Sequence, residues 1–191
     1  RPPRSTLFPY TTLFRSTVLR AYPTFPLSFG EASGGRVLVS PIGKRPGVLF
    51  SALRACQTDG KNLPARRLVI CSRETEDLIA EASQQASFSG EGERLRLEDP
   101  FGGRPEIERV VKAARPHLLG ADEVLVNVTG GTTLMGLVAE ALAGTARQLA
   151  RPVRRFGLID RRPPADQDAD PYQVGDPFWL DRAEGADGDD D

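Results

Sequence analysis

Val124-Leu-Val-Asn-Val-Thr-Gly-Gly-Thr-Thr133 is the stretch that decides the fold of this 191-residue chain. Its first half is a nearly continuous run of apolar, β-branched residues, which is typical of a strand buried on both faces of a parallel sheet. Gly130 and Gly131 then break the strand. Apolar residues at helical spacing follow: Leu134, Leu137, Val138, Ala141 and Leu142. The stretch therefore predicts a strand, a tight turn and a helix that covers the sheet.

The same pattern recurs on both sides of this stretch. Short apolar segments predict further strands at residues 36–42, 68–71, 94–98 and 153–159. Apolar residues at helical spacing predict helices over residues 49–56, 74–86 and 107–118. Strands that alternate with helices form a parallel sheet with right-handed crossovers. We therefore expect an α/β fold over residues 36–161: a Rossmann-like, doubly wound, mainly parallel five- to six-stranded sheet with helices on both faces.

The composition is that of a soluble globular protein, with 39% apolar residues, 27% charged residues and a formal net charge of −1. No apolar run approaches the ~20 residues that a membrane-spanning helix needs. Two cysteines, Cys56 and Cys71, indicate a reducing, cytoplasmic setting rather than a disulfide framework. A single histidine, His117, excludes sites that need two imidazoles, and we expect neither a metal nor a cofactor. The charge balance leaves no basic patch for long nucleic acid.

Four segments lie outside the expected domain. Residues 1–16 have no periodicity and resemble a translated sequencing adapter, so we expect them to be an artefact and the native chain to begin at or after Thr17. Residues 17–35 are rich in Pro, Gly and Ser, which predicts a disordered leader. Residues 162–180 form a C-terminal extension whose apolar end either docks back on the domain or caps a dimer. Residues 181–191 are strongly acidic and predict a disordered tail.

Ligands of such sheets bind beyond the carboxyl ends of the strands, at the point where the strand order reverses. The turn after the strand at residues 124–128 is the most specific feature of this edge. Gly130 and Gly131 let the backbone approach a ligand closely, and the following helix presents free N–H groups and a positive dipole end. Hydroxyl and basic side chains flank the turn or lie in the neighbouring loop: Thr129, Thr132, Thr133, Lys44 and Arg45. The turn predicts a metal-free anion or phosphate site, and the alternative is a tight strand-to-helix turn that merely needs glycine.

Familiar catalytic and phosphate-binding motifs are absent from the sequence. The segment at Gly43 is not a P-loop, because arginine rather than serine or threonine follows Lys44. No G-x-G-x-x-G follows the first strand, which disfavours a nicotinamide or flavin site. Ser40 and His117 make no triad, since the histidine lies near the end of a helix, far from the ligand edge. Cys71 is a candidate nucleophile, but a buried strand thiol is the commoner reading.

The segment Asn127-Val-Thr-Gly-Gly-Thr-Thr133 resembles the signature of CARF domains, the CRISPR-associated Rossmann fold, whose usual form is N-x-T-G-G-T-K. Three other loops agree in kind: Val39-Ser40 before a Gly/Pro turn, Cys71-Ser72, and Asp99-Pro100. The resemblance spans about residues 36–161. It implies a sensor of cyclic oligoadenylate, the second messenger of type III CRISPR antiviral defence. It also implies a homodimer whose two-fold axis the cyclic ligand crosses.

The resemblance further implies roles for individual residues. Catalytic roles in opening the ring fall on Ser40, Lys44 and Thr132. Ligand contacts fall on Gly43, Ser72, Asp99, Asn127, Thr129, Gly130, Gly131 and Thr133. Thr133 departs from the family, which usually has lysine at this position, and Lys44 is the nearby lysine that could substitute for it.

Three functions follow from these observations. The first is a CARF protein that binds cyclic oligoadenylate and opens it as a metal-independent ring nuclease, with a ribose 2′-hydroxyl of the substrate as the nucleophile. The second is a non-catalytic sensor, or a fragment of a larger CARF effector, that acts through an effector partner. The third is a nucleotide-binding Rossmann-like enzyme unrelated to CRISPR.

Overall fold

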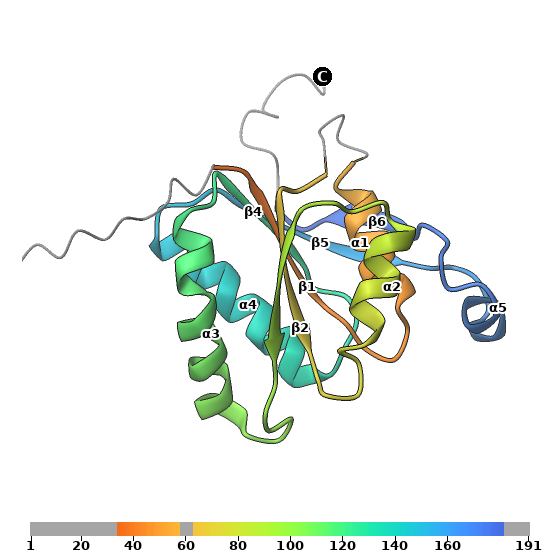
Figure 1. Cartoon of the computed structure of the whole chain (residues 1–191), viewed down its shortest axis with the longest axis horizontal. Coiled ribbons are helices and arrows are strands. Elements are labelled where there is room, and N and C mark those ends of the chain that lie inside the picture. Colours follow the sequence, from red (N-terminus) through yellow and green to blue (C-terminus); the bar gives the residue numbers. More distant parts are fainter. Residues whose placement is uncertain (1–33, 58–62, 182–191) are drawn as a thin grey trace, which may run out of the picture. The chain divides into compact units, whose positions relative to one another are not determined.

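A computed structural model of the chain describes residues 34–57 and 63–181 (Figure 1). Strands and helices alternate along almost the whole of this part: β1 (Arg36–Pro41), α1 (Gly47–Ala55), β2 (Arg66–Cys71), α2 (Leu78–Gln85), β3 (Glu91–Arg96), α3 (Gly103–Leu119), β4 (Glu123–Asn127), α4 (Thr133–Gln148), β5 (Val153–Ile159), α5 (Pro164–Ala169) and β6 (Asp176–Trp179).

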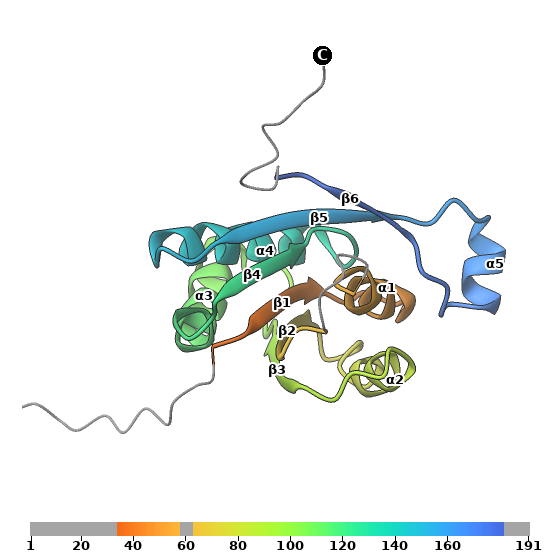
Figure 2. The ribbon, with the colours of Figure 1, turned by 90° about the horizontal axis from the view of Figure 1, so that it is seen from above.

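The strands form one six-stranded sheet in the order β3-β2-β1-β4-β5-β6 (Figure 2). All neighbouring pairs from β3 to β5 are parallel, and β6 runs antiparallel to β5. The chain moves outward from β1 to β3 on one side and then returns to the centre at β4. This order confirms the predicted α/β, Rossmann-like, mainly parallel sheet.

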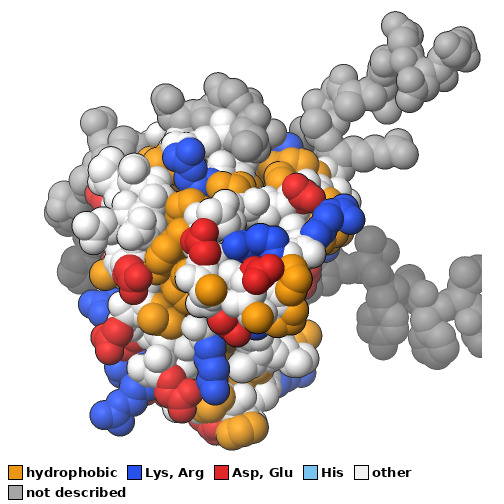
Figure 3. Space-filling view, turned by 90° about the vertical axis from the view of Figure 1, so that its right-hand side faces the viewer, with side chains coloured by type: hydrophobic (Ala, Val, Ile, Leu, Met, Phe, Trp, Pro, Cys, Tyr) orange, Lys and Arg blue, Asp and Glu red, His pale blue; other side chains and the backbone are white. Residues whose placement is uncertain are grey.

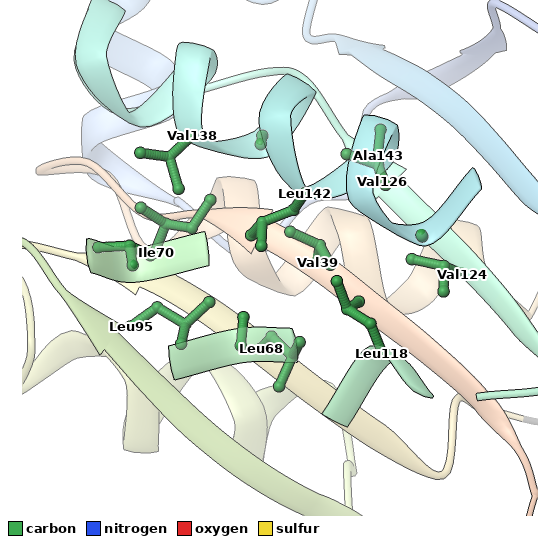
Figure 4. Close-up of a cluster of buried hydrophobic side chains, with 14 of the residues drawn as sticks. Val39, Leu68, Ile70, Leu95, Leu118, Val124, Val126, Val138, Leu142 and Ala143 are labelled. Carbon is green, nitrogen blue, oxygen red and sulfur yellow. The ribbon is translucent and has the colours of Figure 1, made fainter. Parts of the chain in front are cut away.

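Helices cover both faces of the sheet, with α1 and α2 on one face and α3 and α4 on the other (Figures 1 and 2). Successive strand residues point to opposite faces, so Val37 and Val39 pack in the core beneath α3 and α4, whereas Leu38 packs beneath α1 and α2. Figure 4 shows the first of these cores, where Leu118 of α3 and Leu142 of α4 meet the strands. Because both faces are covered, most residues of the central strands β1 and β4 are apolar, and Ser40 and Asn127 are buried polar exceptions.

Strand β3 and helix α2 do not begin where the sequence predicted. β3 spans Glu91–Arg96, whereas the apolar pattern predicted residues 94–98. It is an edge strand in which Leu95 is buried and its neighbours are exposed and mostly charged, so its apolar pattern is weak. Helix α2 begins at Leu78 rather than at residue 74, because the preceding residues form turns in which Leu78 N–H donates to the carbonyl of Thr75.

The C-terminal extension joins the sheet. The chain leaves β5 through residues 160–175, which we call the strap and which contain α5, and returns as the edge strand β6. Trp179 packs against Phe156 of β5 with ring centroids 5.0 Å apart, and the Arg154 guanidinium lies 3.9 Å from the centroid of the Trp179 ring. The apolar segment therefore docks back on the domain, and the sheet extends past residue 161, where the predicted domain ended.

The expected adapter-derived segment at residues 1–16 lies outside the described residues. The expected leader and acidic tail also lie outside them, apart from Gly34, Gly35 and Asp181. Within the part of the chain that the structure describes, no helix has the length and apolar character needed to cross a membrane.

Candidate functional site

β1 and β4 are neighbours at the centre of the sheet, and the chain leaves them in opposite directions. β1 leads to α1 and then outward to β2, whereas β4 leads to α4 on the other face and then to β5. Ligands of open α/β sheets bind at such a reversal, beyond the carboxyl ends of the strands. Two loops meet there: the β1–α1 loop at residues 42–46 and the β4–α4 turn at residues 128–132. We call this pair of loops the switch-point site.

A buried amide fixes the shape of the β4–α4 turn. Asn127, the last residue of β4, is fully buried. Its Nδ2 donates to Ser40 Oγ at 3.0 Å and to the Thr129 carbonyl at 3.1 Å. Its Oδ1 accepts from the Thr129 N–H at 2.9 Å. These bonds satisfy both amide hydrogens, so Asn127 shapes the turn from within, and its direct contact with a ligand stays a prediction.

The turn requires glycine at two positions. Gly130 has φ of +95° and Gly131 has φ of +72°, values that residues with a side chain rarely adopt. The space around them is also closed. A Cβ atom on Gly130 would lie 2.7 Å from Val48 Cγ1, and one on Gly131 would lie 2.6 Å from Met135 Sδ. The turn therefore presents bare backbone, as an anion site built from N–H groups requires.

Helix α4 begins directly after this turn. Thr132 is its N-cap, with an extended backbone and with Oγ1 accepting from the Met135 N–H at 3.4 Å. The other N–H groups of the first turn have no acceptor within the helix, and the positive end of its dipole lies there. Thr132 and Thr133 are both exposed. The combination is a site that favours negative charge.

The β1–α1 loop packs against the turn. A Cβ atom on Gly43 would lie 3.1 Å from the backbone nitrogen of Gly131, so the two loops touch at their backbones. Lys44 is exposed, and Arg45 Nε donates to Asp168 Oδ1 of α5 at 2.8 Å. One open hollow brings the loops together and is lined by Gly43, Lys44, Arg45, Val48, Gly130 and Gly131.

Ser40 lies beneath the switch-point site. Its side chain is fully buried, its Oγ accepts from Asn127 Nδ2, and its hydroxyl donates to the Pro41 carbonyl at 3.2 Å. The hydroxyl is therefore hydrogen-bonded on both sides by groups of the protein, Asn127 and the Pro41 carbonyl. The predicted catalytic role of Ser40 stays a prediction, and the geometry gives the residue a supporting position.

Two predicted ligand residues lie in the loops after the outer strands. The Ser72 Oγ shares a hydrogen bond of 3.3 Å with Thr75 Oγ1, and Asp99 Oδ1 accepts from the Phe101 N–H at 2.8 Å. These side-chain bonds remain within their own strand–helix turns. The structure thus brings Gly43, Lys44 and the glycine turn together, and it does not join Ser72 or Asp99 to them.

Cys71 is a buried thiol in the structure, with no exposed surface at the end of β2. Burial raises its pKa to about 11, so it is protonated at neutral pH and a weak nucleophile. Among the described residues, no group of three or more His, Cys, Asp or Glu side chains is arranged to hold a metal ion.

A pocket of about 230 Å³ adjoins the switch-point site, and the sequence did not reveal it. It lies between α1, the β4–α4 turn, the end of β5 and the strap, on the face that carries α5, where acidic and basic side chains are mixed (Figure 3). Its lining residues are Arg45, Gly47, Val48, Ser51, Thr129, Leu158, Asp160, Arg162, Gln167, Pro171, Gln173 and Gly175. We call it the strap pocket. The residues of the strap match no motif, so only the fold brings them together.

The fold and the switch-point site define a class: a Rossmann-like α/β protein with a glycine turn suited to an anion at the reversal of its sheet. No family model and no curated protein matches the sequence. Among solved structures, the chain is similar to Csm6 of Enterococcus italicus bound to cyclic hexa-2′-fluoro-hexa-dAMP, with a TM-score of 0.49 and 13% sequence identity. The match covers 78% of this chain and 42% of that chain, so this chain spans less than half of its length. A likeness this distant does not assign a site or a ligand.

Proposed function

We propose that this chain is a CARF-type module that binds cyclic oligoadenylate at the switch-point site of a homodimer and opens the ring without a metal. The observation that carries the proposal is the turn Asn127-Val-Thr-Gly-Gly-Thr132. It has the residues of the CARF signature, and its bare backbone lies at the positive end of α4. A cytoplasmic location and an effector partner belong to the same proposal.

The shape of the ligand supports the homodimer. A cyclic oligonucleotide of even symmetry offers the same phosphates twice, and a two-fold dimer offers the same loops twice. The exposed hydroxyls of Thr132 and Thr133 and the ammonium group of Lys44 then meet phosphodiesters on both halves of the ring. A charged donor and N–H groups around each phosphate suit an anionic ligand without a metal.

Ring opening needs only groups of the ligand and the protein. The 2′-oxygen of one ribose attacks the adjacent phosphorus in line, and the bond from phosphorus to the 5′-oxygen breaks. The proton lost from the 2′-hydroxyl is balanced by one that the 5′-oxygen gains from water, which leaves a 2′,3′-cyclic phosphate and a 5′-hydroxyl. Lys44 and Thr132 stabilise the charge that develops on the phosphate oxygens. Ser40 contributes by holding Asn127, and hence the turn, in position.

A non-catalytic sensor is the second candidate, and the residue at position 133 favours it. Thr133 stands where the CARF signature usually has lysine, which removes one cation from the switch-point site. Lys44 is the remaining lysine in the two loops. Whether the ring is opened therefore depends on Lys44.

The test uses the full chain with cyclic tetra- and hexa-adenylate in EDTA, with products separated by chromatography and oligomeric state measured by sedimentation. We expect a dimer that yields linear products ending in a cyclic phosphate. Lys44→Ala should slow cleavage about 100-fold, the order observed when one stabilising donor is removed from a transition state. Lys112→Ala is the matched control, because Lys112 is an exposed lysine on α3, and it should leave the rate unchanged.

Each outcome has a clear meaning. Tight binding without cleavage would make the chain a sensor and contradict the ring-nuclease part of the proposal. An equal loss of rate in Lys44→Ala and Lys112→Ala would remove Lys44 from the mechanism. Failure of the wild-type chain to bind either ring would contradict the whole proposal and leave a nucleotide-binding Rossmann-like enzyme of another kind to consider.

A further inference from the structure

The strap pocket is held open by contacts between the strap and the body of the domain. The Ser51 hydroxyl donates to the Gln173 carbonyl at 2.9 Å, and Ser51 Oγ accepts from the Gly175 N–H at 3.2 Å. Gly47 lies so close to the Pro171 carbonyl that any side chain there would collide with it. These contacts fix the strap at one end of the pocket, so the pocket is formed before a ligand arrives.

Arginine side chains fix the other end of the strap. Arg45 Nη1 donates to Gln167 Oε1 at 2.9 Å, while Arg45 Nε pairs with Asp168 at 2.8 Å. Arg162 pairs with Asp160 at 2.7 Å and donates to the Asp170 carbonyl at 2.9 Å. Gln167 Nε2 donates to the Arg162 carbonyl at 2.7 Å. Both polar atoms of the Gln167 side chain are therefore hydrogen-bonded within the wall of the pocket, so we assign this side chain no contact with a ligand.

Two polar groups of the lining keep capacity for a ligand. Thr129 Oγ1 accepts from the Leu158 N–H at 2.8 Å, and among the residues that the structure describes its hydroxyl hydrogen has no acceptor. Hydrogen bonds from Arg162 lower the pKa of Asp160, so its carboxylate is ionised at neutral pH. The backbone N–H, Nε and Nη2 of Arg162 donate to it, which leaves one of its roughly four acceptor positions for a ligand. The pocket thus offers one donor and one acceptor beside the apolar side chains Val48, Leu158 and Pro171.

Size and position limit the occupant. A volume of about 230 Å³ is below the ~300–1,000 Å³ of sites for drug-sized ligands, so the pocket suits a flat ring rather than a whole oligonucleotide. Arg45 and Val48 line both this pocket and the hollow of the switch-point site. A ligand whose phosphate lies on the glycine turn can therefore extend an attached base into the strap pocket.

We propose that the strap pocket binds one adenine base of the cyclic ligand, with the Asp160 carboxylate accepting from its 6-amino group and the Thr129 hydroxyl donating to a ring nitrogen. The inference rests on the proposed function for the identity of the ligand. It assigns base specificity to Asp160 of the strap together with Thr129 of the β4–α4 turn, so the strap adds a base contact that lies outside the loops of the CARF signature.

The test compares cyclic tetra-adenylate with the matching ring built from purine riboside, which lacks only the 6-amino groups, by calorimetric binding to the full chain. We expect the wild type to bind the purine riboside ring more weakly than cyclic tetra-adenylate. The loss should be about tenfold for each base that can no longer donate a hydrogen bond to the charged Asp160 carboxylate. In Asp160→Ala the ratio of the two dissociation constants, purine riboside ring to cyclic tetra-adenylate, should fall towards one. Asp166→Ala, an exposed acidic residue of α5 outside the pocket, should keep the wild-type ratio.

The ratio separates recognition from folding, because a variant that merely loosens the strap weakens both rings alike. A wild-type ratio of one, or an unchanged ratio in Asp160→Ala, would overturn the inference while cyclic tetra-adenylate still binds and the proposed function stands. If neither ring binds, the proposed function fails. The strap pocket is then tested by itself with the 5′-monophosphates of adenosine and purine riboside. Tighter binding of the adenosine monophosphate that Asp160→Ala removes would support the adenine site, and any other result would overturn it.

Discussion

The amide of Asn127 joins β1, β4 and the β4–α4 turn through bonds to Ser40 and Thr129. Sequence reasoning found this residue because it belongs to the CARF signature, and it expected a ligand contact. The structure adds a different reason for an amide here. Only a side chain with both a donor and an acceptor can bond to the hydroxyl of Ser40 and to both backbone groups of Thr129. That requirement depends on contacts between two strands that are neighbours in the sheet but far apart in the sequence, so the pattern of residues does not reveal it.

We predict that Asn127→Ala lowers the free energy of unfolding by about 1–3 kcal/mol, since it leaves buried polar groups without partners. Urea unfolding followed by circular dichroism measures the change. Gln148→Ala, which removes an exposed amide at the end of α4, is the control and should shift stability by less than ~0.5 kcal/mol. Equal effects of the two substitutions would contradict the role given to Asn127.

At the scale of elements, the central strands could be predicted from sequence and the edges could not. β1 and β4 are largely apolar because helices cover both of their faces, and the observed positions of β1, β4 and β5 lie within a residue of the predicted ones at each end. Most residues of β3 are exposed, and α5 is rich in acidic residues and has no buried residue. Their positions are set by backbone pairing and by arginine contacts, and neither of these requires apolar residues at regular spacing in the sequence.

The first turn of helix α3 contains the carboxylate of Glu106, whose charge stabilises the fold. Glu106 Oε1 accepts from the Glu98 N–H at 2.6 Å, and Arg109 donates to both of its carboxylate oxygens. The hydrogen bond from Arg109, the bond from the Glu98 backbone and the Arg109 charge lower the pKa of Glu106 to about 2 despite its burial. A lowered folded-state pKa gives stability that is complete above the ordinary value of 4.5 and is lost as the pH falls towards 2.

We predict that wild-type stability falls between pH 4.5 and pH 2 and that Glu106→Gln is less stable at pH 7 with a flatter profile below pH 4.5. Thermal unfolding across this pH range measures both effects. Glu108→Gln serves as the control, because the Glu108 side chain is 63% exposed in its pair with Arg104 and its loss should change little. Parallel profiles for wild type and Glu106→Gln would show that this carboxylate does not set the acid sensitivity.

At the scale of the whole molecule, the sheet order brings two kinds of feature to one edge. The switch-point site has a motif in the sequence, because its turn needs particular residues within one short segment. The strap pocket has none, since its lining residues come from the β1–α1 loop, α1, the β4–α4 turn, β5 and the strap, which lie far apart in the chain. The fold alone makes them neighbours, with Arg45 lining both.

The role of the glycine turn is tested most directly by the affinity of the wild-type chain, Gly131→Ala and Gly136→Ala for cyclic tetra- and hexa-adenylate. A Cβ atom on Gly131 collides with Met135 and strains a backbone at φ of +72°, whereas one on Gly136 of α4 meets nothing within 4 Å. We predict that Gly131→Ala weakens binding at least about tenfold, the equivalent of ~1.4 kcal/mol, while Gly136→Ala binds like wild type. Equal affinity of all three proteins, or no binding by the wild type, would contradict the claim that the glycine turn binds a cyclic oligoadenylate.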